Sequence, residues 1–185
     1  YADAGTDNSR AFRYDITGPP SGLSAPVNTE VYALLAKIEG TAADAYSNIP
    51  PGSVDLSVQR DGDNWYWNPS NGWSSGSSQW FTATSTYTLK SVNWYYDFSD
   101  IWHTSYTYTA QSRARDVTTT GANQGAASGI VTFYIDKSNP GSAITFPTTL
   151  PQKTVASITG TAWDNRKMYL ADPLHASRVR IYKAV

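Results

Sequence analysis

The sequence predicts an all-β protein folded as an antiparallel β-sandwich, and three observations lead to this prediction. Thr, Ser, Tyr, Trp and Val are abundant while Leu, Glu, Lys and Met are sparse, so strand formers outnumber helix formers. Apolar residues alternate with polar ones over short stretches, which is the period of a strand with one buried face. Turn sequences separate seven or more such stretches, as in a two-sheet sandwich of roughly 100 residues.

The clearest candidate strand begins at Val54. Val54, Leu56 and Val58 fall on one face, and the polar residues between them, Asp55 and Ser57, fall on the other. Because side chains alternate across a strand, we expect the apolar face to be buried and the polar face to be open.

Two later stretches, 106–114 and 130–135, alternate in the same way. The sequence between them, Gly121 to Gly125, is typical of a turn, so the two strands should form an antiparallel hairpin. Residues 31–38 form a more continuous apolar run that is too short for a stable helix, and we predict a strand there. Further short strands are expected around 64–67, 79–83, 87–89 and 93–98.

Composition excludes several classes of function. A net charge of -1 leaves no basic surface for nucleic acid, and no stretch approaches the roughly 20 apolar residues that membrane insertion requires. The chain has no Cys and only two His, so disulfides and thiolate zinc sites are excluded and an enzyme is disfavoured. The low charged fraction of 16% and the many hydroxyl side chains favour an extracellular or cell-surface location.

The sequence also repeats itself. Residues 12–21 return as 133–142 at an offset of about 121 residues, and 38–44 return as 158–164. We therefore expect tandem repeats with incomplete repeats at both ends. The expected domains are 1–15, the final hairpin of a preceding repeat; 16–136, a complete repeat; and 137–185, the first strands of a following repeat.

Several motifs resemble the bacterial Ig-like repeats of large extracellular and cell-surface proteins, and together they cover nearly the whole chain. The resemblance implies Ig-like sandwiches in a tandem array, with a structural or adhesive use and no catalysis. The Asp-x-x-Gly-Asn turn expected after Arg-Ala-Arg-Asp is loosened here into residues 117–123. The motifs are the linker 14–20, Ile-Glu-Gly-Thr-Ala-Ala-Asp at 38–44, 54–60, the Trp-rich 66–80, 93–98 and Tyr-Thr to Arg-Ala-Arg-Asp at 106–116.

Asp15, Asp44 and Asp116 form a candidate metal site. In such a sandwich the incoming linker and the turns after the second and sixth strands meet at one end, so the three carboxylates should converge there. Hard divalent cations bind clusters of oxygen ligands, and calcium-stiffened junctions in cadherin-like proteins use an arrangement of this kind. Calcium at the junction between repeats is the one cofactor considered. The alternative is that each Asp caps its own turn by accepting backbone N–H bonds.

Trp73 and Trp80 are the candidate ligand-binding residues. Six of the seven Trp lie between Trp65 and Trp102, and aromatic side chains serve either as core or as platforms for sugar rings. The two candidates flank the Ser/Gly tract 74–78, which favours the surface of the molecule.

Two other groups of residues invite a chemical interpretation that their surroundings do not support. Residues 61–64, Asp-Gly-Asp-Asn, lack the later ligands of a calcium loop, so we predict a hairpin turn. His103 and His175 have no nucleophile at a recognised spacing, and we expect no catalytic residues.

The sequence thus leads to a non-catalytic structural or adhesive repeat of a long extracellular bacterial protein or fibre. Its partners would be adjacent repeats or identical subunits. One alternative is a carbohydrate-binding module of a larger secreted enzyme, with polysaccharide as its partner. A second alternative is a filament subunit assembled by strand donation, because Ile158 and its neighbours in the incomplete repeat lack a partner sheet.

Overall fold

The computed structural model describes residues 14–86, 88–104, 106–118, 121–148, 154 and 156–163. Every regular element in these residues is a strand, which confirms the predicted all-β class. No helix in the described part of the chain is long and apolar enough to cross a membrane. The strands are β1 (Ser21–Ala25), β2 (Val31–Tyr32), β3 (Lys37–Ala43), β4 (Val54–Arg60), β5 (Trp65–Asn68), β6 (Gly72–Ser74), β7 (Phe81–Thr82), β8 (Ser91–Asp97), β9 (Tyr106–Ala114), β10 (Val131–Ile135), β11 (Gly141–Phe146) and β12 (Thr159–Trp163).

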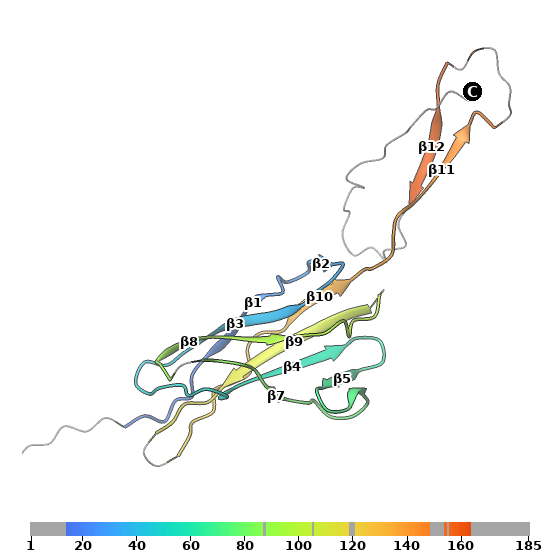
Figure 1. Ribbon diagram of the computed structural model, residues 1–185. Helices are drawn as coiled ribbons and strands as arrows, with labels where there is room; N and C mark the ends of the chain where they lie inside the picture. The colour runs from blue at the N-terminus through green and yellow to red at the C-terminus, as the bar shows by residue number, and fades with distance from the viewer. Residues whose placement is uncertain are drawn as a thin grey trace, which may run out of the picture.

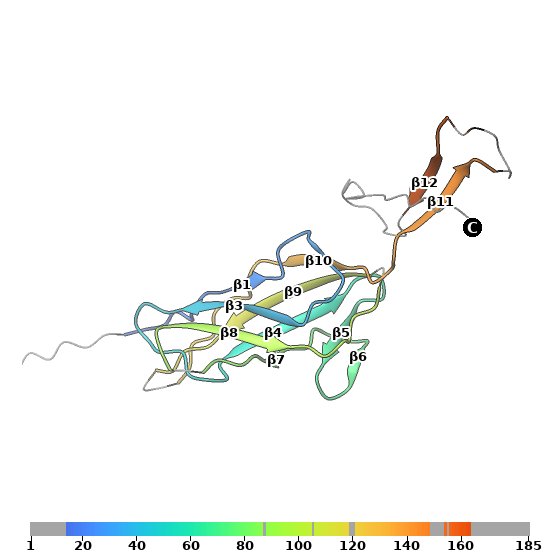
Figure 2. The same ribbon diagram turned by 45° about the horizontal axis from the view of Figure 1, so that its top comes forward.

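Two sheets build the sandwich-like body of the protein. One has the strand order β1-β3-β8, and the other has the order β2-β10-β9-β4-β5-β6, with β7 paired to β4. Both views show β3 and β8 lying over β4 and β9 (Figures 1 and 2). All pairings are antiparallel except the short one between β2 and β10.

The core lies between the sheets and contains side chains from both. The burial pattern of β3 alternates, with Ile38, Gly40 and Ala42 inside and their neighbours outside. Alternation of this kind is what a strand with one covered face requires. Among the apolar residues of the strands expected from Val54, at 106–114 and at 130–135, Val54, Leu56, Val58, Tyr108 and Phe133 are buried, Val131 is half-buried and Tyr106 is 38% exposed.

The expectation that the polar face of β4 is open is wrong. Asp55 and Ser57 are only 7% and 6% exposed, so both faces of this strand are covered. β4 is a central strand beside β9, and Asp55 forms ion pairs with Arg113 at 3.2 Å and with Arg115 at 3.4 Å. A buried carboxylate needs such partners, and periodicity in one strand does not reveal them.

The single strand expected over residues 31–38 is divided between the two sheets. Val31 and Tyr32 pair with β10 in parallel, whereas the chain from Lys37 onward pairs with β1 and β8. Tyr32 packs edge-on against Phe133, with 6.4 Å between ring centroids. The segment therefore crosses from one sheet to the other between Tyr32 and Lys37.

A separate hairpin, β11–β12, lies beyond the end of β10 in both views (Figures 1 and 2). Its register matches that of β1–β3. Ser142 pairs with Ala162 and Ile144 with Gly160, as Ser21 pairs with Ala42 and Leu23 with Gly40. Both hairpins also have an irregularity directly after these pairs, at Leu23/Ala25 and Ile144/Phe146.

Several predicted elements fall partly or wholly outside the described residues. These are residues 1–13 of the expected final hairpin at 1–15, Tyr87 in the strand expected around 87–89, and residues 149–153, 155 and 164–185 of the repeat expected to begin at 137.

Candidate functional site

The structure brings Asp15, Asp44 and Asp116 together at the end of the sandwich where the incoming linker arrives. One carboxylate oxygen from each lies within 4.8 Å of the others. Asp15 belongs to the linker before β1, Asp44 directly follows β3, and Asp116 lies two residues beyond β9. Residues separated by up to about 100 positions in the sequence therefore meet at one place because two strands end there.

Asp15 is held by hydrogen bonds from both the linker and the sandwich. Its Oδ1 accepts bonds from the Thr17 amide at 3.1 Å and the Thr17 hydroxyl at 3.0 Å. Its Oδ2 accepts a short bond from the Ser47 hydroxyl. The Ser47 bond, followed by that from the Thr17 amide, lowers the pKa of Asp15 below its ordinary value, because both bonds favour the charged carboxylate.

Asp44 and Asp116 each organise a turn. Asp44 Oδ1 accepts bonds from the amides of Tyr46 and Ser47, both at 2.7 Å. Asp116 is fully buried, and its Oδ1 accepts a bond from the Asn123 amide at 2.6 Å. The turn-capping bonds considered from the sequence are thus present together with the convergence of the carboxylates.

Asn123 connects the linker to the buried aspartate. Its side-chain Nδ2 donates to the backbone oxygen of Asp15 at 3.1 Å and to Asp116 Oδ2 at 3.2 Å. The sequence interpretation missed both Asn123 and Ser47. Ser47 directly follows Tyr46, whose position two residues after Asp44 is typical of an Asx turn, whereas nothing local to Asn123 indicates its bond to Asp15.

The three carboxylates of this cluster could hold a cation. The ion pairs found among the described residues involve Asp55, Asp63 and Asp100, so none neutralises the cluster. Negative charges this close repel one another, most strongly where one of them is buried. Calcium binds oxygen at about 2.3–2.6 Å, so oxygens on opposite sides of one ion lie about 5 Å apart, which is compatible with the 4.8 Å spread.

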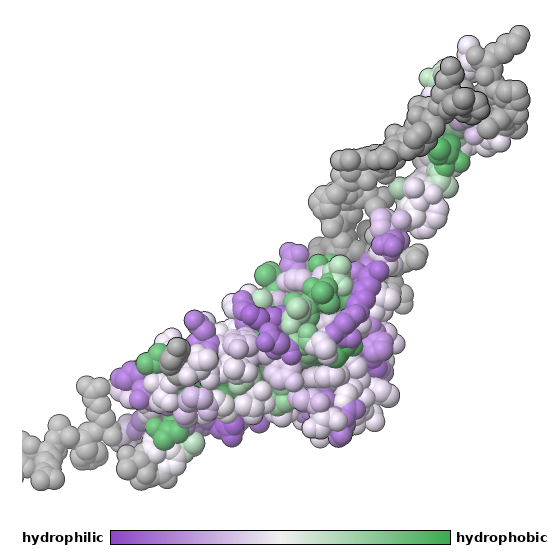
Figure 3. Space-filling model, viewed as in Figure 1, coloured by the Kyte–Doolittle hydropathy of each residue, from purple (hydrophilic) through white to green (hydrophobic). Residues whose placement is uncertain are grey.

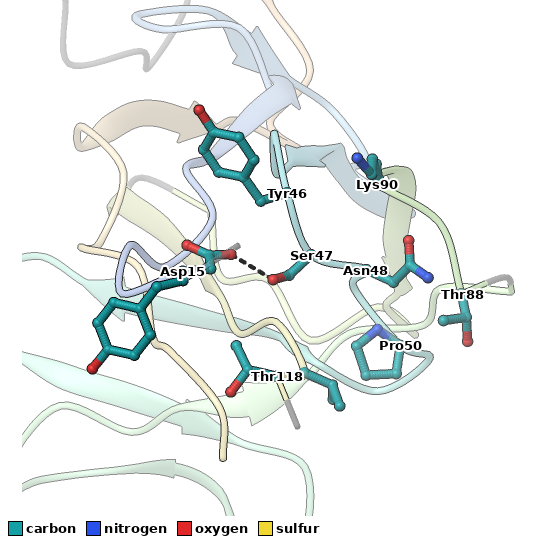
Figure 4. Close-up of a pocket in the computed structure, with 10 residues that line it drawn as sticks. Asp15, Tyr46, Ser47, Asn48, Pro50, Thr88, Lys90 and Thr118 are labelled. Atoms are coloured by element: carbon teal, nitrogen blue, oxygen red, sulfur yellow. Dashed lines mark hydrogen bonds between the residues drawn. The ribbon is translucent and has the colours of Figure 1, made fainter. Parts of the chain in front are cut away.

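A hollow of about 600 Å³ lies beside the cluster (Figure 4). Tyr46 lies on its wall near Asp15, and Lys90 lies farther along the wall, where its ammonium donates to the Ala45 carbonyl oxygen at 2.9 Å. Tyr14 and Tyr46, which both line the hollow, are 80% and 58% exposed. The hollow is lined by Tyr14, Asp15, Tyr46, Ser47, Asn48, Pro50, Thr88, Lys90, Val117 and Thr118.

The two candidate ligand-binding tryptophans have different surroundings. Trp73 is half-buried, its indole N–H donates to the Ile101 carbonyl oxygen at 3.0 Å, and its ring packs 5.4 Å from that of Tyr108. Trp80 is also half-buried and lies under the Arg113 guanidinium, 4.2 Å from the ring centroid. Both rings are thus engaged by neighbouring side chains.

The predicted turn at 61–64 joins β4 to β5, with Arg60 paired to Trp65. Asp63 forms an ion pair with the buried Arg60. The Arg60 guanidinium also lies 4.8 Å from the ring centroid of Tyr106 and 5.3 Å from that of Trp65. This turn therefore fixes an arginine among aromatic rings.

His103 is not part of the carboxylate cluster. His103 is exposed, and its backbone exchanges hydrogen bonds with the Tyr108 hydroxyl at 2.8 and 3.0 Å. His175 lies outside the described residues. A scan against protein-family models and a search of curated proteins both give no match to the chain.

Proposed function

We propose that the chain is a non-catalytic structural or adhesive Ig-like repeat of a long extracellular bacterial surface protein or fibre. In this proposal a divalent cation, calcium by its ligand chemistry, stiffens the junction with the preceding repeat. The observation that carries the proposal is the position of Asp15. A linker residue lies within 4.8 Å of carboxylates from two turns of the sandwich.

A cation held by Asp15, Asp44 and Asp116 would tie the linker to the sandwich at a defined angle. Without it the linker keeps the hydrogen bonds from Ser47 to Asp15 and from Asn123 to the Asp15 carbonyl. A metal ion adds stronger contacts and removes the repulsion between the carboxylates. The junction would then transmit force instead of bending.

The path of the chain supports a serial arrangement. The linker reaches one end of the sandwich, and β10 leads from the other end toward the β11–β12 hairpin (Figure 1). The matching registers of β1–β3 and β11–β12 are what a second repeat of the same kind would give. Repeats joined end to end in this way would form an extended stalk.

The core supports mechanical stability in a chain that has no cysteine. Trp102 packs against Phe98, Tyr108 and Phe133 with ring centroids 4.9–5.5 Å apart. Its indole N–H donates to the Leu35 carbonyl oxygen at 2.6 Å, which joins two distant segments. Aromatic pairs contribute about 0.5–1.5 kcal/mol each beyond their buried area. We do not extend the proposal to carbohydrate binding, because the Trp73 ring and N–H are used internally.

Terbium luminescence tests the proposed cation site. Tb³⁺ has oxygen-ligand preferences like those of calcium, and the ring of Tyr46, which lines the hollow beside Asp15, can sensitise it. We expect saturable Tb³⁺ emission that calcium displaces, and an emission loss in D15N, D44N and D116N. Asparagine keeps an oxygen that accepts the backbone N–H bonds of each turn. If the three aspartates only cap turns, Tb³⁺ emission should therefore be the same in these variants as in the unmodified chain.

The matched control is D61N, which changes an aspartate in the exposed β4–β5 turn. Saturating calcium should also raise the melting temperature, since a ligand at 100 times its Kd stabilises by about 2.7 kcal/mol. If chelation leaves both melting temperature and small-angle scattering profile unchanged, the stiffened junction is refuted.

A further inference from the structure

The β12 edge differs from the edge of its counterpart β3 in one respect. β3 pairs on one side with β1 and on the other with β8, in a register from Lys37–Asp97 to Ala43–Ser91. Within the described residues, β12 pairs with β11 alone. In the described part of the chain, the second hairpin therefore has an uncovered edge where its counterpart in β3 is covered by β8.

Burial at matching positions differs in the same way. Ile38 is 0% exposed, whereas Ile158, its counterpart, is 38% exposed. Leu23 is half-buried against the core, whereas Ile144 is 60% exposed. Figure 3 shows hydrophobic surface on this hairpin. Exposed apolar area next to an unpaired strand edge is a favourable docking surface for another strand.

The covered edge of β3 shows which strand chemistry fits. Trp94 of β8 pairs directly with Gly40, and a Cβ on Gly40 would lie 2.5 Å from the Trp94 ring and 2.0 Å from the Gly22 carbonyl oxygen. The glycine thus makes room for the indole and for the irregular β1 strand. Gly160 has the same place in β12, where a Cβ would lie 2.6 Å from the Ala143 carbonyl oxygen.

The backbone of β12 is oriented to receive such a strand. The Ala43 amide donates to the Pro20 carbonyl, so alternate residues of β3, among them Gly40 and Ala42, direct their amides toward β8. By the shared register, Gly160 and Ala162 direct their amides toward the open edge of β12.

We propose that the β12 edge binds an antiparallel strand of β8 type, with the pattern Val-x-Trp-x-Tyr and its tryptophan over Gly160. This inference rests on the proposed repeat architecture and names the partner of its incomplete unit. The partner strand comes from outside residues 1–185. No tryptophan follows Trp163 in the sequence, and Ser91–Asp97 of any copy is already paired with β3.

A labelled peptide with the sequence of residues 89–98 tests the proposal on the full 185-residue chain. We expect fluorescence anisotropy to rise saturably as the chain is added. A W94A peptide should bind at least tenfold more weakly, because the void over Gly160 stays empty. The chain variant A162P should weaken binding at least tenfold, since it removes an amide that faces the open edge.

Two further variants guard against misfolding and non-specific binding. A162E keeps the backbone amide but places a charge on the apolar face, and it should weaken binding like A162P. S142A changes β11 and should bind like the unmodified chain. Retained cross-strand NMR contacts between Ala143 and Thr161 would verify that the hairpin persists in each variant.

Three outcomes would overturn the proposal. These are a peptide that fails to bind at all, a peptide that binds A162P and A162E as tightly as the unmodified chain, and a chain that self-associates in a way that A162P abolishes. The last would assign the edge to a second copy by strand exchange. Loss of peptide binding with intact Tb³⁺ binding would refute this inference alone, whereas loss of Tb³⁺ binding alone would refute the cation-stiffened junction.

Discussion

Ser47 donates its hydroxyl hydrogen to the Asp15 carboxylate across 32 positions of sequence. This bond connects the incoming linker to the turn that Asp44 organises, because the Ser47 amide binds Asp44 Oδ1 at 2.7 Å. A single residue therefore contacts two of the three carboxylates. It positions the linker whether or not a cation is present.

Replacing Ser47 by alanine should raise the pKa of Asp15 toward its ordinary value, because the largest cause of the lowering is removed. The pKa of Asp15 in the folded state lies below its unfolded value of 3.8. The contribution of Asp15 to stability is therefore fully present above pH 3.8 and is lost as the pH falls through the folded-state pKa. An NMR titration of the Asp15 carboxyl carbon in chelator, from about pH 2 to 6, measures the change. S70A, in the exposed β5–β6 turn, should leave the titration unchanged, and a S47A curve that coincides with it would contradict the prediction.

Replacing Gly40 by alanine should destabilise the sandwich by about 1–3 kcal/mol, the usual cost of overpacking a core. The added Cβ would meet the Gly22 carbonyl oxygen at 2.0 Å and the Trp94 ring at 2.5 Å. A Cβ added to Gly22, in the paired strand, would meet no atom within 4 Å, so G22A should change stability by under about 0.5 kcal/mol. Urea unfolding of the two variants makes the comparison, and equal midpoints would disprove it.

Replacing Arg60 by leucine should destabilise the fold by about 1–3 kcal/mol. Arg60 is 6% exposed and interacts with Asp63 and with the ring of Tyr106 at 4.8 Å. K37A is the control, since exposed Lys37 lies over Tyr95 at 4.9 Å and should contribute under about 0.5 kcal/mol. Thermal unfolding followed by tryptophan fluorescence measures both, and an R60L loss no larger than that of K37A would count against the prediction.

Stability should fall at alkaline pH through Tyr108. Burial raises the pKa of Tyr108 from 10.0 to about 12, so the folded state disfavours the phenolate. The contribution of Tyr108 is fully present below pH 10 and is lost as pH rises toward 12. Y108F should be less stable at neutral pH, since it removes bonds to the His103 backbone, and its stability should vary less between about pH 9 and 11. Denaturant unfolding across that range tests this, and a Y108F slope equal to that of the unmodified chain would be inconsistent with it.

Local patterns determined much of the fold. The alternation from Tyr106 to Ala114 predicts a strand with the bounds that β9 has, because period-two alternation reflects one covered face. The turn residues at 61–64 predict the β4–β5 hairpin, because Gly62 and Asn64 tolerate the positive φ angles of 97° and 58° found there. The repeated sequence at 158–164 predicts the β12 region, although β11 and β1 were not predicted from their own residues.

The tertiary structure decided which residues meet. The sequence by itself places Asp15, Asp44 and Asp116 at the ends of elements, but their 4.8 Å grouping depends on how the sheets are ordered and where each strand stops. The same holds for Asp55, which forms an ion pair with Arg113 of β9, and for Trp73, whose ring packs against that of Tyr108. Periodicity reports the two faces of one strand, whereas these contacts join segments far apart in the chain. Such contacts form only because packing two sheets face to face brings those segments together.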